Sequence, residues 1–216
     1  MDRYDPRKRV GLIVDEWGAW YKVEPGTNPG FLYQQNTLRD ALVAGINLNI
    51  FNAHCDRVRM ANLAQTVNVL QALVLTDKEK MVVTPTYHVF DMYKVHQEAV
   101  LLPLDLKCRD YVMGEEKIPC LSVSASSDGQ DKIHITLCNL DPYKSVPLIC
   151  DIRGVNPQVI AGDILTASEM NAHNTFENPE AVKPEAFFNA RLNNGKIEAI
   201  LPPKSIVSLQ IIIFSE

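Results

Sequence analysis

The fold of this chain is limited first by a short apolar segment that ends in two carboxylates. Residues 10–14 read Val-Gly-Leu-Ile-Val, and Asp15 and Glu16 follow them directly. Continuous apolar runs of this length are typical of strands that are buried on both faces of a parallel sheet, whereas half-exposed strands alternate apolar and polar residues. The segment therefore predicts a buried parallel strand that carries carboxylates at its carboxyl end.

Helix and strand signals alternate after this strand, up to about residue 97. Thr37 and Asp40 have the spacing of a capping box, which predicts a helix start. The apolar residues that recur at helical spacing behind it are Leu38, Leu42, Ile46 and Ile50. Residues 54–65 then predict a loop that enters a second buried strand. Thr84 followed by Pro85 predicts the start of another helix, which extends to about Gln97.

The pattern changes to short apolar or alternating stretches from residue 98 onward. These stretches cover residues 121–125, 133–137, 146–152, 159–165, 187–192 and 206–214. Turn-forming pairs such as Asp128-Gly129 and Asn194-Gly195 separate them, and no helical pattern lies between them. Such a series predicts an antiparallel β-sandwich. The fold class expected for the whole chain is therefore α/β plus all-β.

Length and charge exclude several classes of protein. The net charge of −5 argues against nucleic acid as a partner, because phosphate binding uses a clustered excess of Lys and Arg. The apolar runs are far shorter than the roughly 20 residues of a membrane-spanning helix, and the first residues lack the apolar core of a secretory signal. A complete (β/α)8 barrel needs roughly 250 residues, which is more than the 216 of this chain.

Cysteines and histidines predict neither disulfides nor a metal site. The five cysteines are an odd number without a Cys-x-x-Cys pair. We therefore expect free thiols, with Cys120, Cys138 and Cys150 as small buried side chains in apolar stretches. Among the histidines only His88 and His96 share a predicted helix, and eight residues is too wide a spacing for one ion. No metal ion and no cofactor is expected.

Acidic and aromatic residues gather at the end of the first strand. Because successive side chains of a strand point to opposite faces, Asp15 and Glu16 are expected on different faces and need not have the same function. The aromatic residues that follow are Trp17, Trp20 and Tyr21. Flat aromatic faces beside carboxylates suit a sugar, and carboxyl ends of parallel strands are where barrel enzymes bind substrates. The alternative is an acidic strand end that only caps a loop or pairs with a lysine. Asp15 is expected to be structural and to pair with Arg57 or Arg59.

The same segment carries a resemblance to a known family. Residues 10–21, Val-Gly-Leu-Ile-Val-Asp-Glu-Trp-Gly-Ala-Trp-Tyr, resemble the nucleophile segment of the retaining α-L-arabinofuranosidases of glycoside hydrolase family 51. The resemblance continues through residues 24–31, 38–42, 53–65, 67–69 and 84–90, and residues 201–207 resemble the last strands of the family's C-terminal sandwich. It implies that residues 1–97 form the last βα units of a (β/α)8 catalytic barrel and residues 98–216 the C-terminal β-sandwich.

The resemblance also implies residue roles. Glu16 is similar to the catalytic nucleophile, Trp20 to an aromatic residue that lines the substrate cleft, and Gln65 to a glutamine that hydrogen-bonds the arabinofuranose. Retaining glycosidases need an ionised carboxylate to attack the anomeric carbon, and an amide can donate to and accept from sugar hydroxyls. Without the resemblance, Gln65 would be interpreted as a strand-end amide that satisfies backbone groups.

One part of the expected machinery is missing from the sequence. The family's acid/base glutamate follows an asparagine, and this chain contains no Asn-Glu dipeptide. The resemblance thus implies the C-terminal part of an exo-acting enzyme that removes terminal arabinofuranosyl residues from hemicellulose, a part that is inactive alone and prone to association. The alternative is a non-catalytic β-sandwich module for structure, sugar binding or subunit contacts.

The partners follow from the same resemblance. They are an arabinose-containing oligosaccharide or polysaccharide and further copies of the chain, because the family commonly forms homo-oligomers. No nucleic acid and no membrane is expected as a partner. Free cysteines favour a reducing compartment, and thus the cytoplasm over the periplasm or secretion.

Overall fold

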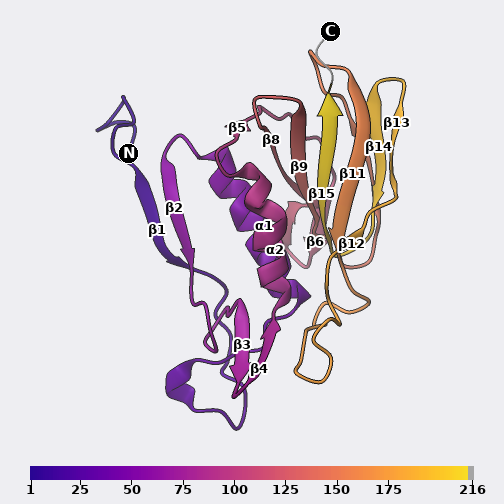
Figure 1. Cartoon of the computed structure of the whole chain (residues 1–216). Helices are drawn as coiled ribbons and strands as arrows, with labels where there is room; N and C mark the ends of the chain where they lie inside the picture. The colour runs from indigo at the N-terminus through magenta and orange to yellow at the C-terminus, as the bar shows by residue number, and fades with distance from the viewer. Residues whose placement is uncertain (214–216) are drawn as a thin grey trace.

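Two antiparallel sheets make up the larger part of the computed structural model, which describes residues 1–213 (Figure 1). One sheet has the strand order β12-β11-β15-β9-β8-β5 and the other the order β10-β14-β13. The strands of the first are Val100–Leu101 (β5), Leu121–Ser127 (β8), Lys132–Asn139 (β9), Pro157–Leu165 (β11), Glu185–Ala186 (β12) and Ser205–Ile213 (β15). Those of the second are Val146–Cys150 (β10), Ala190–Asn193 (β13) and Lys196–Leu201 (β14). The predicted β-sandwich is confirmed.

The apolar core of the sandwich lies between these two sheets. Leu137 and Leu209 from the six-stranded sheet and Ile197 and Leu201 from the three-stranded sheet are at most 1% exposed. Complete burial of such a side chain stabilises a fold by about 1.5–3 kcal/mol relative to exposure. The sandwich therefore has a core of its own, built from residues on the inner faces of both sheets.

Two helices, Leu38–Ala53 (α1) and Pro85–Tyr93 (α2), cover the other face of the six-stranded sheet (Figure 1). α1 begins as predicted, because the Asp40 carboxylate accepts the backbone N–H of Thr37 at 2.8 Å. α2 is shorter than predicted, and a separate 3-10 turn, Lys94–His96 (η2), follows it. The prediction that His88 and His96 share one helix is therefore wrong.

Hydrogen bonds between polar side chains join the helices to the sheet. The Asn49 side chain of α1 donates to Ser122 Oγ at 3.0 Å, and that of Asn52 donates to Ser124 Oγ at 3.1 Å. Successive side chains of a strand point to opposite faces, so alternate serines of β8 all face the helices. The helices thus contact β8 through polar side chains, whereas an apolar cluster that includes Cys138, Leu165 and Ile206 joins them to β9, β11 and β15.

The strands Leu12–Trp17 (β1) and Val58–Leu63 (β2) form a parallel pair on the far side of the helices (Figure 1). Both strands occur where the sequence predicts them. The burial expected for them is not observed, because the side chains of Ile13 in β1 and Met60 in β2 are 55% and 53% exposed, and Val10, just before β1, is 58% exposed. The cause is that only two strands make up this sheet, so no further strand covers its edges among residues 1–213.

The remaining elements are short. Two hairpins that the sequence did not predict consist of Val74–Asp77 (β3) with Lys80–Val83 (β4) and Asp110–Met113 (β6) with Glu116–Pro119 (β7), and Pro29–Phe31 (η1) is a 3-10 turn. The stretch predicted as one strand over residues 187–192 lies partly in the loop between β12 and β13. Phe214, the last residue of the predicted final strand, lies outside the described residues. No helix among residues 1–213 is long and apolar enough to cross a membrane.

Candidate active site

Glu16 lies in an irregularity at the carboxyl end of β1. Val14 pairs with Ala61 and Trp17 pairs with Leu63, so Asp15 and Glu16 together lie opposite the single Asn62. An extra residue of this kind is a β-bulge, a feature that re-aims side chains and is common beside active sites. The side chain of Glu16 is exposed.

Trp17 fixes the end of β1 to the helix layer. Its indole contacts Phe51 of α1 edge-on at 5.3 Å between ring centroids and stacks with Phe90 of α2 at 6.2 Å. Aromatic pairs at these separations add about 0.5–1.5 kcal/mol beyond the area that they bury. The strand end that carries Glu16 is thus held against both helices through its neighbour.

Gln65 lies just after the neighbouring strand end. The Ala64 N–H donates to the Trp17 carbonyl at 3.0 Å, and the Gln65 N–H donates to the Leu70 carbonyl at 2.6 Å. The peptide bond between Ala64 and Gln65 is cis. The parallel pairing brings Glu16 and Gln65 to the same edge of the β1–β2 pair, and the Gln65 side chain is exposed there.

Trp20 belongs to the loop that leaves this edge, and its side chain is 62% exposed. The backbone on both sides of it is bound by buried glutamines that the sequence analysis did not single out. The Ala19 carbonyl accepts from Gln34 Nε2 at 2.9 Å and from Gln71 Nε2 at 2.8 Å. The Tyr21 N–H donates to Gln34 Oε1 at 2.9 Å.

Asp40 connects this loop to the start of α1. Its fully buried carboxylate accepts from Gln71 Nε2 at 3.0 Å and lies 3.1 Å from Arg39 Nη2. The Arg39 guanidinium in turn lies 3.6 Å from the centroid of the Tyr21 ring, a cation–π contact. Partial burial is the main reason why the pKa of Tyr21 is raised. Asp40 was predicted only as a capping residue, and sequence spacing gave no signal for its contact with Gln71.

The expected pairing of Asp15 with Arg57 or Arg59 is wrong. Arg57 binds Asp2 and, at 2.8 Å, Asp5. The reason is the parallel register, which places Val58 beside Leu12 and therefore puts both arginines at the opposite end of β1 from Asp15.

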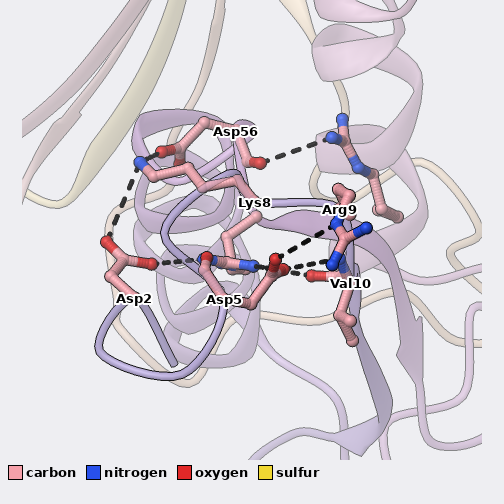
Figure 2. Close-up of polar contacts among 8 residues, drawn as sticks. Asp2, Asp5, Lys8, Arg9, Val10 and Asp56 are labelled. Atoms are coloured by element: carbon pink, nitrogen blue, oxygen red, sulfur yellow. Dashed lines mark hydrogen bonds and ion pairs between the residues drawn. The ribbon is translucent and has the colours of Figure 1, made fainter.

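The N-terminal segment folds back over this opposite end of the strand pair. Figure 2 shows Asp2 and Asp5 together with the ion pair between Lys8 and Asp56. The hydrogen bond from the Val10 N–H and the Arg57 guanidinium lower the pKa of Asp5. This charged cluster lies at the amino end of β1, so it belongs to a different part of the molecule from Glu16.

Metal ligands and reactive thiols do not gather at the candidate site. Among residues 1–213 no three His, Cys, Asp or Glu side chains could hold one metal ion. All five cysteines are free, and Cys120 and Cys138 are buried as predicted, whereas Cys150 is only half-buried. Burial raises the pKa of Cys138 to about 12.

Comparisons with known proteins place this chain in a family. The model of the alpha-L-arabinofuranosidase C-terminal domain matches residues 15–205. The intracellular exo-alpha-L-arabinofuranosidase of Bacteroides ovatus is 46% identical over 212 residues, which cover 98% of this chain and 41% of the relative. The intracellular exo-alpha-(1->5)-L-arabinofuranosidase of Streptomyces lividans is 24% identical, over 96% of this chain and 33% of that protein.

Solved structures agree with the sequence comparisons. The crystal structure of the GH51 arabinofuranosidase from Xanthomonas axonopodis pv. citri matches with a TM-score of 0.95 and 50% identity, over 98% of this chain and 43% of that one. A family 51 alpha-L-arabinofuranosidase from Bifidobacterium longum matches with a TM-score of 0.81 and 26% identity, over 93% and 42% of the two chains. The chain thus spans less than half of the length of these relatives. It belongs to the alpha-L-arabinofuranosidase C-terminal domain family and corresponds to the C-terminal part of family 51 enzymes.

Proposed function

We propose that this chain is the C-terminal part of a retaining, exo-acting α-L-arabinofuranosidase in which Glu16 is the nucleophile and Trp20 and Gln65 bind the sugar. The observation that carries the proposal is the position of Glu16 in a bulge at the carboxyl end of β1, at the same edge as Gln65 on the parallel neighbour β2. Active sites of (β/α)8 barrels lie at this edge of their strands.

The chemistry assigned to Glu16 is a double displacement. Its carboxylate attacks the anomeric carbon, the bond to the leaving oxygen breaks, and that oxygen takes a proton from a second carboxyl group about 5–5.5 Å from the nucleophile. Water then attacks the anomeric carbon of the glycosyl–enzyme ester and gives its proton to that second group, which restores the free Glu16 carboxylate. The second carboxyl group is assigned to polypeptide outside this chain, because the chain has no Asn-Glu dipeptide.

In this proposal residues 1–97 are the last two βα units of a (β/α)8 barrel and residues 98–216 are its C-terminal sandwich. The exposed apolar side chains of β1 and β2 support the division, since Leu12, Ile13 and Met60 are each at least 40% exposed and would be buried against further barrel strands. The sandwich, in contrast, already has a buried core.

The substrate class proposed is a terminal arabinofuranosyl residue of a hemicellulose polysaccharide or oligosaccharide. The exposed indole of Trp20 offers an apolar face for the sugar C–H groups, and the exposed Gln65 amide offers a donor and an acceptor. The five free thiols support a cytoplasmic site of action, and so does the fact that the relatives from Bacteroides ovatus and Streptomyces lividans are described as intracellular.

A chimera tests the proposal. This chain replaces the matched part of the Bacteroides ovatus relative, and hydrolysis of 4-nitrophenyl α-L-arabinofuranoside is measured. The chimera should be active, Glu16→Gln should lower kcat by at least about a thousand-fold, and the control Glu79→Gln, in the exposed turn of the β3–β4 hairpin, should retain activity. Mass spectrometry after an acid quench should find an arabinofuranosyl ester on the peptide that contains Glu16.

The alternative function is a non-catalytic sandwich module, and the separate apolar core between the two sheets favours it. In that case Glu16→Gln would leave the activity of the chimera unchanged. The chain alone would then bind arabino-oligosaccharides with an affinity that does not depend on Glu16, as measured by calorimetry.

A further inference from the structure

We propose that Gln34 and Gln71 are positioning residues that hold the backbone on both sides of Trp20, and thereby set the orientation of its indole toward the sugar. The inference rests on the proposed substrate-binding role of Trp20. It adds two residues to which neither the sequence pattern nor the resemblance gives a role.

The loop around Trp20 depends on side chains for its conformation. Within the described part of the chain, residues 18–21 make no backbone–backbone hydrogen bond. The backbone groups next to Trp20 are bound by amides instead, with two donors on the Ala19 carbonyl and one acceptor for the Tyr21 N–H. These three hydrogen bonds therefore restrain the backbone that carries the exposed ring.

Both glutamines are placed where movement is difficult. Gln34 is 2% exposed and Gln71 is 1% exposed. Gln71 is also restrained from two sides. Its amide donates to Asp40 Oδ1 at 3.0 Å. The backbone of Gly18 packs so closely on the Gln71 side chain that a Cβ atom added to Gly18 would lie 2.6 Å from Gln71 Cγ. Gly18 has a φ of 151°, so the loop turns tightly over the Gln71 side chain. The fully buried Asp40 holds the amide from the start of α1.

The position of Gln71 costs stability, which argues against a purely structural role. Its backbone has a φ of 54°, in the left-handed region that favours glycine. Its buried Oε1 has no hydrogen-bond partner among the described residues, and an unpaired buried acceptor of this kind costs about 1–3 kcal/mol. Departures from local rules are expected where they position a functional group, and here both amide hydrogens are used to hold the loop and α1 together.

Fluorescence of Trp20 tests the positioning directly. The chain has two tryptophans, so a Trp17→Phe background leaves Trp20 as the only emitter. In that background, Gln34→Met and Gln71→Met should increase the amplitude of the fast component of the anisotropy decay. Gln34→Glu, which keeps the acceptor for Tyr21 but loses the donor to Ala19, should give a smaller increase. The matched control is Gln35→Met, since the neighbouring Gln35 side chain has no hydrogen bond among the described residues, and it should leave the decay unchanged.

Measurements of KM and kcat in the chimera test whether the loop affects substrate binding. Loss of two hydrogen bonds from the loop is expected to raise KM about ten-fold in Gln34→Met, with kcat changed less than three-fold. Gln34→Glu should fall between this variant and the parent, and Gln35→Met should match the parent. A lower stability alone would lower the active fraction, and thus kcat, without raising KM.

Two outcomes would overturn the inference. One is an unchanged Trp20 anisotropy decay in both methionine variants. The other is a kcat/KM within two-fold of the parent in Gln34→Met, measured in a chimera that Glu16→Gln inactivates, because the proposed function would then stand without a role for the glutamines. Activity that survives Glu16→Gln would instead contradict the proposed function itself.

Discussion

We expect the free energy of unfolding to decrease as the pH falls from 6.5 to 4, because His96 is harder to protonate in the folded protein than in the unfolded chain. The imidazole lies between the helices and β8–β9, where Nδ1 is 2.7 Å from Ser126 Oγ and Nε2 is 2.9 Å from Thr136 Oγ1. The Thr136 hydroxyl donates to Asn49 Oδ1 at 3.0 Å, so Thr136 accepts from Nε2–H and Nδ1 accepts from Ser126. The two contacts thus fit a neutral ring with its proton on Nε2.

The magnitude follows from the pKa. Burial, with a smaller contribution from nearby His134, lowers the pKa of His96 from 6.5 to about 4. As the pH falls below 6.5, the unfolded chain takes up a proton that the folded chain does not, so the free energy of unfolding decreases. At 1.36 kcal/mol per pH unit the loss is about 2 kcal/mol at pH 5 and about 3 kcal/mol near pH 4, where it levels off. Above pH 7 both states are neutral and His96 contributes no pH dependence.

Urea unfolding followed by far-UV circular dichroism, at one protein concentration and several pH values, measures this effect. His96→Gln removes the titration but keeps a side chain that donates and accepts, so its stability should fall about 2 kcal/mol less than that of the parent between pH 7.5 and pH 5. Burial also lowers the pKa of His88, but that contribution is present in both proteins and cancels. His54→Gln, which removes an exposed imidazole, should keep the acid sensitivity of the parent. Equal losses in His96→Gln and the parent would refute the reasoning.

Three further predictions concern other parts of the molecule. Gly45→Ala should destabilise the protein by about 1–3 kcal/mol in urea unfolding despite the better helix propensity of alanine, because the new methyl would lie 2.7 Å from the buried Cys138 Sγ; a gain in stability would contradict the contact. Iodoacetamide at pH 8 should alkylate the exposed Cys55 in the native protein and Cys138 only after unfolding, as read by peptide mass spectrometry; early labelling of Cys138 would refute its burial. The isolated chain should associate through β1 and β2, and light scattering that finds a stable monomer would contradict this expectation.

Local sequence signals predicted both helices and most strands, but neither the β3–β4 and β6–β7 hairpins nor the contacts between distant segments. Thr37 and Asp40 gave the start of α1 because a capping box is complete within four residues. The hydrogen bond from Gln71 to the Ala19 carbonyl joins residues that are 52 positions apart, and no rule based on local residue spacing predicts such a contact. The partner of Arg57 was mispredicted for the same reason, because Asp2 and Asp5 reach it only once the N-terminal segment folds back.

Burial of β1 was mispredicted for a different reason. A continuous apolar run is typical of a strand that has neighbours on both edges and is covered on both faces. In this chain β1 has one parallel neighbour, β2, and the helix layer on one side. The apolar pattern of β1 therefore fits a larger parallel sheet than the two strands present among the described residues. In the sandwich, where both sheets are present, the same kind of pattern agrees with the structure, and Val207, Leu209 and Ile211 of β15 are fully buried.

The helix layer links the candidate site to the sandwich. Phe51 of α1 packs on Trp17 next to Glu16, while Asn49, two residues earlier on the same helix, binds Ser122 and Thr136 on the sheet. Residues two apart on a helix point in different directions, so α1 contacts the strand pair on one side and the sandwich on the other. Hydrogen bonds require a defined geometry, whereas apolar contacts tolerate sliding. The polar contacts with β8 and β9 therefore restrict the rotation of α1 beyond what its apolar packing on the sheet does, and Trp17 connects α1 to the strand end that carries Glu16.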